Sequence, residues 1–354
     1  MGARSATLAG MRLDTPGLTI TELRADDPAE VEAAFEIERI ALAHDVPDFP
    51  PPCRYRHDKH LRHDFPGRRA LRSLAYLDGT PVGYLEVELA LLDNLDNADV
   101  GIIVLPEHRR RGVGRALFAR AADLARANGR KRIHGMTGEG LPGGEPRDPA
   151  GTAFAETMGM QAALRDVRRR LDLSTVDRAE HDRLLAESWA KAGGYSVVQW
   201  QDAVPDEYVD DIAALDSSFL GEAPMGDLEL EPEKVDADRI RKVEATRRSF
   251  GVREYNTGLR HDATDRVVAW SSLSRRRTIP WHAMQTITLV DPRHRGHRLG
   301  MVSKVENLRL MLRHEPDVWA IDTWNAAVNT HMIAINEQMG FRPVDAWVEW
   351  QMNL

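Results

Sequence analysis

Apolar and polar residues follow one another along the chain in two successive series that predict the same order of strands and helices. In the first series, residues 115–127 have apolar positions at helical spacing, and this helix is expected to end at Asn128-Gly129. The pair Asp78-Gly79 predicts a hairpin turn between two strands. The expected strands are 18–23, 70–76, 81–91, 99–105, 131–136 and 167–173, and the expected helices are 28–43, 115–127 and 152–158.

The second series repeats this order after a helical stretch at 174–194 that is closed by Gly193-Gly194. Each series predicts a mixed central sheet with helices on its faces, in the α/β (α+β) class. We therefore expect two domains of one fold, residues 1–173 and 195–354, joined by a helical linker at 174–194. The expected strands are 195–200, 251–259, 266–274, 284–290, 318–324 and 346–352, with helices from Asp206, at 299–313 and at 329–338.

Two short segments indicate that the second series is an internal duplication of the first. Residues 104–117 are VLPEHRRRGVGRAL and residues 290–303 are VDPRHRGHRLGMVS, an offset of 290 − 104 = 186. Downstream, Met-Gly-Met at 158–160 matches Met-Gly-Phe at 339–341, an offset of 339 − 158 = 181. A small insertion in the Gly/Pro-rich stretch 138–149 explains the difference, because such loops tolerate changes in length.

The repeated segment has the composition of a phosphate-binding loop. A basic glycine loop between a strand and a helix N-terminus presents backbone N–H groups and the positive end of the helix dipole to an anion. The dinucleotide pattern GxGxxG and the Walker pattern are both absent. Residues 109–114, Arg-Arg-Arg-Gly-Val-Gly, instead fit [RQ]xxGx[GA]. In its strand-loop-helix context, and repeated, this pattern resembles the acyl-CoA loop of the GNAT N-acetyltransferase superfamily, including tandem-domain members such as mycothiol synthase.

The resemblance implies acetyl-CoA (or another acyl-CoA) as cosubstrate. Gly112 and Gly114 would let the backbone approach the pyrophosphate. The second loop has Arg298 in place of the first glycine, whereas Asn329 matches an Asn that often binds the pantetheine arm in the family. We expect the first loop to be the main site. The cofactor-binding residues expected from the resemblance are Ile103, Val104, Leu105, Arg109, Arg110, Arg111, Gly112, Val113, Gly114, Arg115, Val290, Arg295, Gly296, His297, Arg298, Leu299, Gly300 and Asn329.

Transfer of an acetyl group to an amine requires a base, and four side chains are candidates. Glu86 and Glu88 stand two residues apart on one strand, so both point to the same side. His134 lies on the strand after the loop helix, and histidine titrates near neutral pH. Asp322 is its counterpart in the second series. For each of these side chains, an exposed or structural role is the alternative.

The usual proton donor for the leaving thiolate has no counterpart in this sequence. In many GNAT enzymes it is a Tyr four residues before the Gly of the Gly-Phe element, and here Ala155 and Asn336 occupy those positions. A non-catalytic acyl-CoA-binding regulator is therefore an alternative to an enzyme. A nucleotide-binding protein is a third, weaker hypothesis.

Composition narrows the partners and the compartment. The net charge of −8 argues against nucleic acid, and basic runs such as 168–170 are interpreted as solvated faces. Cys53 is the single cysteine, which fits a reducing cytoplasm, and no apolar run is long enough to span a membrane. No His/Cys cluster has metal-site spacing, so we expect no metal. The sequence predicts a cytoplasmic acyl-CoA-dependent N-acyltransferase that directly acetylates a small cationic amine; the oligomeric state stays open.

Overall fold

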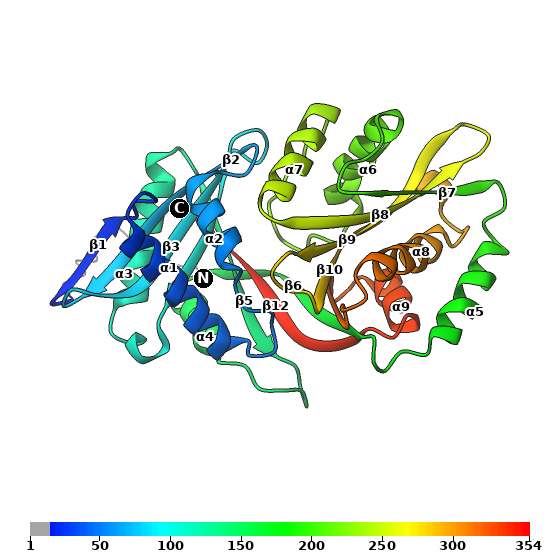
Figure 1. The fold of residues 1–354 in the computed structure, drawn as a ribbon. Helices are drawn as coiled ribbons and strands as arrows, with labels where there is room; N and C mark the ends of the chain where they lie inside the picture. Colours follow the sequence, from blue (N-terminus) through cyan, green and yellow to red (C-terminus); the bar gives the residue numbers. More distant parts are fainter. Residues whose placement is uncertain (1–14) are drawn as a thin grey trace, which may run out of the picture.

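The order of strands and helices in the first half of the chain recurs in the second half, as the sequence predicts (Figure 1). The computed structural model describes residues 15–354. The first half consists of β1 (Leu18–Glu22), α1 (Pro28–Asp45), α2 (Arg54–Arg62), β2 (Arg68–Leu77), β3 (Thr80–Ala90), β4 (Asn97–Val104), α3 (Val113–Ala127), β5 (Arg132–Gly140), α4 (Ala150–Thr157) and β6 (Gln161–Asp172).

Helix α5 (Arg178–Trp189) connects the halves where the sequence predicts a helical linker. The second half consists of β7 (Tyr195–Gln201), α6 (Val209–Glu222), α7 (Ala237–Ser249), β8 (Val252–His261), β9 (Arg266–Arg276), β10 (His282–Val290), α8 (Leu299–His314), β11 (Ala320–Ala326), α9 (Thr330–Gln338) and β12 (Arg342–Asn353). Short 3-10 turns, Pro106–His108 and Pro292–His294, lead from β4 and β10 into the two glycine loops.

Helix α2 is an element that the sequence pattern does not predict. Its nine residues are mostly charged, and only His57 and Leu61 are buried, so no apolar periodicity announces it. Leu61 packs with Ile37 of α1 and with Leu74 of β2 in one apolar cluster. Tertiary contact therefore stabilises a helix whose own sequence pattern is weak.

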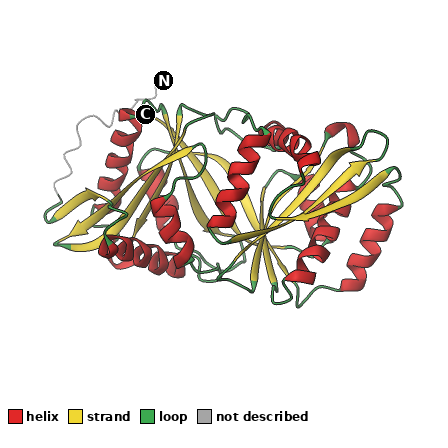
Figure 2. Ribbon diagram, turned by 45° about the horizontal axis from the view of Figure 1, so that its top comes forward, coloured by secondary structure: helices red, strands yellow, loops and turns green. Residues whose placement is uncertain are grey.

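The two halves share one mixed sheet of 12 strands, in the order β1-β2-β3-β4-β5-β12-β6-β11-β10-β9-β8-β7. Strands run through the middle of the molecule, with helices beside them (Figure 2). The last strand of each half lies beside the other half: β12 pairs with β5, and β6 pairs with β11. β12 and β6 also pair with each other at the centre. The halves thus exchange their final strands. The exchange changes where these strands lie in the sheet, and their positions along the chain are those that the sequence predicts.

Helices cover both faces of the sheet in each half. In the first half, α3 packs on Leu85 and Val87 of β3, whereas α1 packs on the opposite face, against Tyr84. In the second half, α8 covers one face, and α6 and α7 cover the other. No helix in residues 15–354 is long and apolar enough to cross a membrane.

The basic run at 168–170 is buried at the centre of the sheet, which contradicts its interpretation as a solvated face. Arg168 is 0% exposed and binds Asp345 of β12 (Nε–Oδ1 2.8 Å), Asp322 of β11 (3.2 Å) and Asp48 of the α1–α2 loop (2.8 Å). Asp322 also accepts two hydrogen bonds from Arg170, at 2.7 and 2.8 Å. A buried arginine is tolerated because three carboxylates surround it, and the sequence alone does not reveal where they come from.

The exchange of strands predicts that a change in β12 destabilises the first half. Trp350 of β12 is buried against Ala155, and its indole N–H donates to Thr137 Oγ1 of β5 at 2.8 Å. The Trp350→Ala variant should lose about 3–5 kcal/mol of unfolding free energy in urea, because it leaves a cavity. Hydrogen exchange should also accelerate in β5, whose sequence is unchanged.

The matched control is Trp319→Ala, at a tryptophan that is 46% exposed, where the loss should stay below about 1 kcal/mol. An equal loss in both variants, or exchange that accelerates only within the second half, would contradict a first half completed by β12.

Candidate active site

The two glycine loops adopt the same backbone conformation with their residue types interchanged. The N-cap of α3 is Gly112 (φ 85°) and the N-cap of α8 is Arg298 (φ 56°), both in the left-handed region. Two residues earlier, Arg110 (φ 63°) matches Gly296 (φ 88°). Each loop therefore has one glycine and one arginine at its two left-handed positions. The alignment with offset 186 is confirmed by this geometry, since glycine adopts such angles most easily.

Each loop follows a strand that parts from its parallel neighbour and opens a wedge in the sheet. β4 pairs with β5 only from Asn97 to Asp99, and the last matched pair is Asp99 with His134. β10 pairs with β11 only from His282 to Met284, and the last matched pair is Met284 with Asp322. Beyond these points, within residues 15–354, this edge of β4 and of β10 has no strand partner, and side chains bind some of its carbonyls, such as Val104 O, which accepts from Arg109. Its remaining N–H and C=O groups can pair with an extended ligand.

The first wedge opens into a cleft of about 870 Å³, here called the first cleft. Leu105 and Val113 are buried in the core, Arg111 is exposed, and none of these three lines the cleft. The other residues predicted on the first loop do line it: Ile103, Val104, Arg109, Arg110, Gly112, Gly114 and Arg115.

The second wedge opens into a cleft of about 880 Å³, the second cleft. Among the residues predicted for it, His297 does not line it. Arg295 is ion-paired with Glu222 of α6 at 2.5 Å. The predicted residues that line the second cleft are Val290, Arg295, Gly296, Arg298, Leu299, Gly300 and Asn329.

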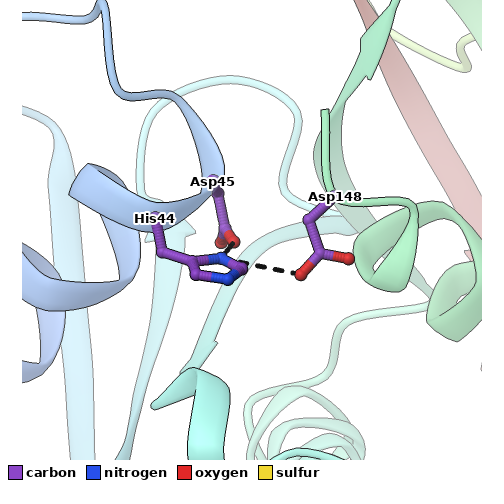
Figure 3. Close-up of side chains that lie close together, drawn as sticks. All are labelled: His44, Asp45 and Asp148. Atoms are coloured by element: carbon purple, nitrogen blue, oxygen red, sulfur yellow. Dashed lines mark hydrogen bonds and ion pairs between the residues drawn. The ribbon is translucent and has the colours of Figure 1, made fainter. Parts of the chain in front are cut away.

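Arg109, the first residue of the loop motif, is held by two carboxylates. Its guanidinium binds Asp45 at the end of α1 (2.8 Å) and Asp148 before α4 (2.5 Å). His44 joins the same carboxylates, with its Nδ1 2.9 Å from Asp45 Oδ1 and 3.7 Å from Asp148 Oδ2 (Figure 3). Within residues 15–354, these three side chains form the one group whose ligand atoms converge as around a metal ion. The Arg109 guanidinium already supplies that cluster with a cation.

His134 is the one predicted catalytic residue that lines both clefts. It is 6% exposed and sits at the apex of the first wedge, where β4 and β5 part. Its Nε2 lies 3.1 Å from Gln351 Oε1 of β12, and its Nδ1 lies 3.7 Å from Asp99 Oδ1. The second half of the chain therefore helps to orient a side chain of the first half.

The predicted pair Glu86 and Glu88 shares one face of β3, but neither lines the two clefts. Glu86 binds Arg72 (2.7 Å) and His60 (3.1 Å). Although burial acts in the opposite direction, these partners lower the pKa of Glu86 to about 2. Glu88 binds Arg68 at 2.9 Å, and burial raises its pKa. A carboxylate held as firmly as Glu86 is a weak proton acceptor.

Asp322 stands at the apex of the second wedge, as the counterpart of His134, but it lines neither cleft. It is 0% exposed and also lies 3.1 Å from His282 Nε2. Burial disfavours its charge, yet Arg170 and His282 hold the pKa of Asp322 below its usual value. Because arginines and a histidine bind its oxygens, the surroundings of Asp322 are those of a structural carboxylate.

Two carboxylates that the sequence analysis does not single out line the second cleft beside His134. Glu349 of β12 and Asp166 of β6 are half-buried and make no hydrogen bond or ion pair within residues 15–354. Burial, together with the charges of Asp166 and Asp99, raises the pKa of Glu349 to about 7. Burial also raises the pKa of Asp166. The exchange of β12 brings Glu349 close to Asp166 and His134, and no pattern in the sequence reveals this exchange.

Comparison with known proteins agrees with this geometry. The Acetyltransferase (GNAT) family model matches residues 34–139, which include the first loop. A solved tandem GNAT protein from the clavulanic acid biosynthesis pathway is 33% identical, with a TM-score of 0.80, over 95% of this chain and 98% of that one. The chain belongs to the GNAT acetyltransferase family.

Two further GNAT relatives extend the comparison. Mycothiol acetyltransferase of Geodermatophilus obscurus is 31% identical over 160 residues, which are 45% of this chain and 46% of that protein, so the match spans about half of it. A GCN5-related N-acetyltransferase from Sphaerobacter thermophilus shares the fold, with a TM-score of 0.62 at 14% identity, over 96% of both chains. The predicted tandem GNAT fold is thus confirmed over nearly the whole chain.

The GNAT cosubstrate, acetyl-CoA, fits the residues of the clefts. Pyrophosphate requires donors that approach closely, and the left-handed Gly112 and Gly296 expose backbone at the loops. A Cβ at Gly114 would lie 3.2 Å from the Phe154 ring, so glycine also keeps α3 close to α4. The unpaired edges of β4 and β10 offer N–H and C=O groups that match the amides of a pantetheine arm.

An unpaired carboxylate next to the apex should have a measurable cost in stability. The pKa of Glu349 is about 7 when folded and near its ordinary value of 4.5 when unfolded, so the wild type loses stability as the pH rises through this window. Glu349→Gln should therefore be more stable than wild type at about pH 8, by about 1–3 kcal/mol, and equal to it near pH 4. Urea unfolding at both pH values measures this difference.

Glu86→Gln serves as the matched control with the opposite sign. Because the pKa of Glu86 is lowered to about 2, its charge stabilises the fold above the unfolded value, and this stabilisation is lost as the pH falls toward 2. The variant should be destabilised at about pH 8. If Glu349→Gln also destabilises the protein there, Glu349 is paired rather than free.

Proposed function

We propose that this chain is an N-acetyltransferase that transfers acetyl directly from acetyl-CoA, bound in the first cleft, to a small cationic amine. The observation that carries the proposal is the position of His134, at the apex of the first wedge and on the wall of both clefts. A thioester entering along the first wedge and an amine entering from the second cleft would meet at this residue.

His134 is arranged to take a proton at Nδ1. Gln351 Oε1 accepts a hydrogen bond from the backbone N–H of Glu229 at 2.8 Å, which identifies it as the oxygen of the amide. His134 Nε2 faces this oxygen at 3.1 Å and must therefore be the donor. The lone pair is then on Nδ1, and Asp99, 3.7 Å away, would stabilise the imidazolium after proton uptake.

The wall around His134 favours a cationic acceptor. Asp99, Asp166 and Glu349 all line the second cleft, and neither Asp166 nor Glu349 has a cationic partner within residues 15–354. An ammonium entering the second cleft would satisfy these carboxylates at little cost in side-chain ordering. The base would then deprotonate an amine that is already held close to the thioester.

The chemistry on the thioester side relies on the backbone. The unpaired edge of β4 next to the apex would present N–H groups to the thioester carbonyl and stabilise the negative charge that develops on its oxygen. Position 155 is a buried alanine, and Tyr84 donates to Glu86, so neither provides an acid to the thiolate. The CoA thiolate would therefore take its proton from a group other than these two.

One observation favours the alternative function, a non-catalytic acyl-CoA-binding regulator. Arg109 is neutralised by Asp45 and Asp148, and a Cβ at Gly112 would lie 2.5 Å from Thr15 Oγ1, so the first loop is crowded. Release of free thiol from acetyl-CoA with a panel of polyamines, aminoglycosides and amino-acid amines separates the two functions. An enzyme turns over with at least one of them, whereas a regulator binds acetyl-CoA and releases none.

Removing the proposed base should abolish chemistry and spare binding. His134→Asn should lower kcat by about 10²–10⁴-fold, whereas the Kd of acetyl-CoA from calorimetry should stay within about threefold. His63→Asn is the control, because His63 is exposed and lines neither cleft. A His134→Asn variant with wild-type kcat would remove the central residue of the proposal.

The two loops can be tested separately with one substitution in each. Gly112→Asp places a carboxylate where the pyrophosphate would bind in the first cleft, and Gly300→Asp does the same in the second. We expect Gly112→Asp to weaken the tighter acetyl-CoA site in calorimetry by more than about 100-fold, because like charges meet.

The backbone consequences of the two substitutions differ, so both variants need a thermal unfolding control. Gly112 has a positive φ, whereas a Cβ at Gly300 would meet side-chain atoms only at 3.6 Å or more. Retention of the tighter site in Gly112→Asp, together with its loss in Gly300→Asp, would assign acetyl-CoA to the second cleft instead.

A further inference from the structure

A buried lysine without a partner lines the second cleft. Lys304, on α8, is 1% exposed, and its Nζ has no hydrogen-bond partner within residues 15–354. The nitrogen lies 5.2 Å from the centre of the Phe341 ring. Burial lowers the pKa of Lys304 to about 7, so a large fraction of the side chain is a neutral amine near neutral pH. A neutral amine is a nucleophile, whereas an ammonium is not.

The register of the sheet relates this amine to the row of residues that ends at the second wedge. Arg342 of β12 is opposite Arg170, Arg170 is opposite Asp322, and Asp322 is the last residue of β11 matched with β10. Phe341 immediately precedes this row, and Lys304 packs its ammonium group over the Phe341 ring. Lys304 therefore lies on the wall of the second cleft, on the helix that follows the second loop.

The polar character of this site is specific to the second half. With the offset of 186, the counterpart of Lys304 is Phe118, which is buried against Phe154. Asn336 is also buried beside Phe341, and its Oδ1 has no partner within residues 15–354; its counterpart is Ala155. At the position of Lys304, the first cleft is lined by a phenylalanine, whereas the second is lined by an unpaired amine.

Lysine is rare in this chain, and only one is buried. Of 47 Lys and Arg residues, six are lysines, which leaves 47 − 6 = 41 arginines. The five others are exposed or half-buried: Lys59, Lys131, Lys191, Lys234 and Lys242. A reagent from solution reaches those five directly, whereas it reaches Lys304 only through the second cleft.

We infer that Lys304 is a self-acetylation site, modified by acetyl-CoA bound in the second cleft. The neutral Nζ attacks the thioester carbonyl carbon; the N–C bond forms, the C–S bond breaks, and the amine proton passes to the thiolate to give free CoA. The product is Nζ-acetyl-lysine, an amide that is neutral, fills the inner end of the cleft and no longer titrates. This inference rests on the part of the proposed function in which the clefts admit acetyl-CoA, but it requires neither His134 nor an amine acceptor.

The experiment is peptide mapping by mass spectrometry of the full chain incubated with acetyl-CoA and no acceptor. Acetyl should accumulate on Lys304 at least about tenfold faster than on any of the other five lysines, because binding holds the thioester beside the amine. The rate should rise as the pH passes through about 7, since the neutral form reacts. A small acetylating reagent, N-acetoxysuccinimide, should give the reverse order and modify the exposed lysines first.

Variants link the modification to the second cleft. Gly300→Asp should abolish acetylation of Lys304, whereas Gly112→Asp, in the first cleft, should leave it unchanged. Lys304→Met should remove the modified peptide. If this variant does not fold, the peptide map of the wild type still shows which lysine is acetylated. Lys304 left unmodified while acetyl-CoA occupies both clefts in native mass spectrometry would overturn the inference, as would labelling that follows exposure.

The two proposals fail in different ways. Amine turnover without modification of Lys304 refutes self-acetylation and leaves the N-acetyltransferase intact. Modification of Lys304 without turnover of any amine supports self-acetylation and refutes the N-acetyltransferase.

Discussion

The pairing of β12 with β5 and β6 is the constraint on which the rest of the molecule depends. It joins two sheets into one, and it gives each half a strand from the other. The ion pairs of Arg168 reinforce it, because this buried cation needs Asp345 of β12, Asp322 of β11 and Asp48 of the first half together. Loss of any one carboxylate would leave charge uncompensated in the interior, so the three segments are held in one arrangement.

This constraint also builds the candidate active site from both halves. Gln351 of β12 orients His134 of β5, and Glu349 of β12 joins Asp166 of β6 on the wall that faces it. The loop before α7 closes the same region, since Glu229 donates its N–H to Gln351 and its carbonyl accepts from Asn97. Residues of the second half therefore hold the apex of the first wedge in place.

Local patterns in the sequence predict most of the fold and the two loops. The 3.6-residue and two-residue periodicities find the strands and most of the helices, and the offset of 186 correctly aligns Gly112 with Arg298, both left-handed N-caps. The exchange of β6 and β12 has no local signal, because an apolar strand pairs equally well inside its own half. Consequently Arg168 is misjudged as solvated, and Glu349 and Asp166 are missed. His134 is found because it follows the loop helix in sequence.

The duplication preserved the backbone and let the chemistry diverge. At the loops, the first half neutralises Arg109 with two carboxylates, whereas Arg295 has one, Glu222, and Arg298 is exposed. Arg110 and Arg115 also line the first cleft and make no ion pair within residues 15–354, and His134 stands at the apex of the first wedge. Anion affinity and proton transfer depend on different residues, so each can change in one half without the other. Because His134 lies on the wall of both clefts, a ligand in either one changes the electrostatic environment of the same imidazole.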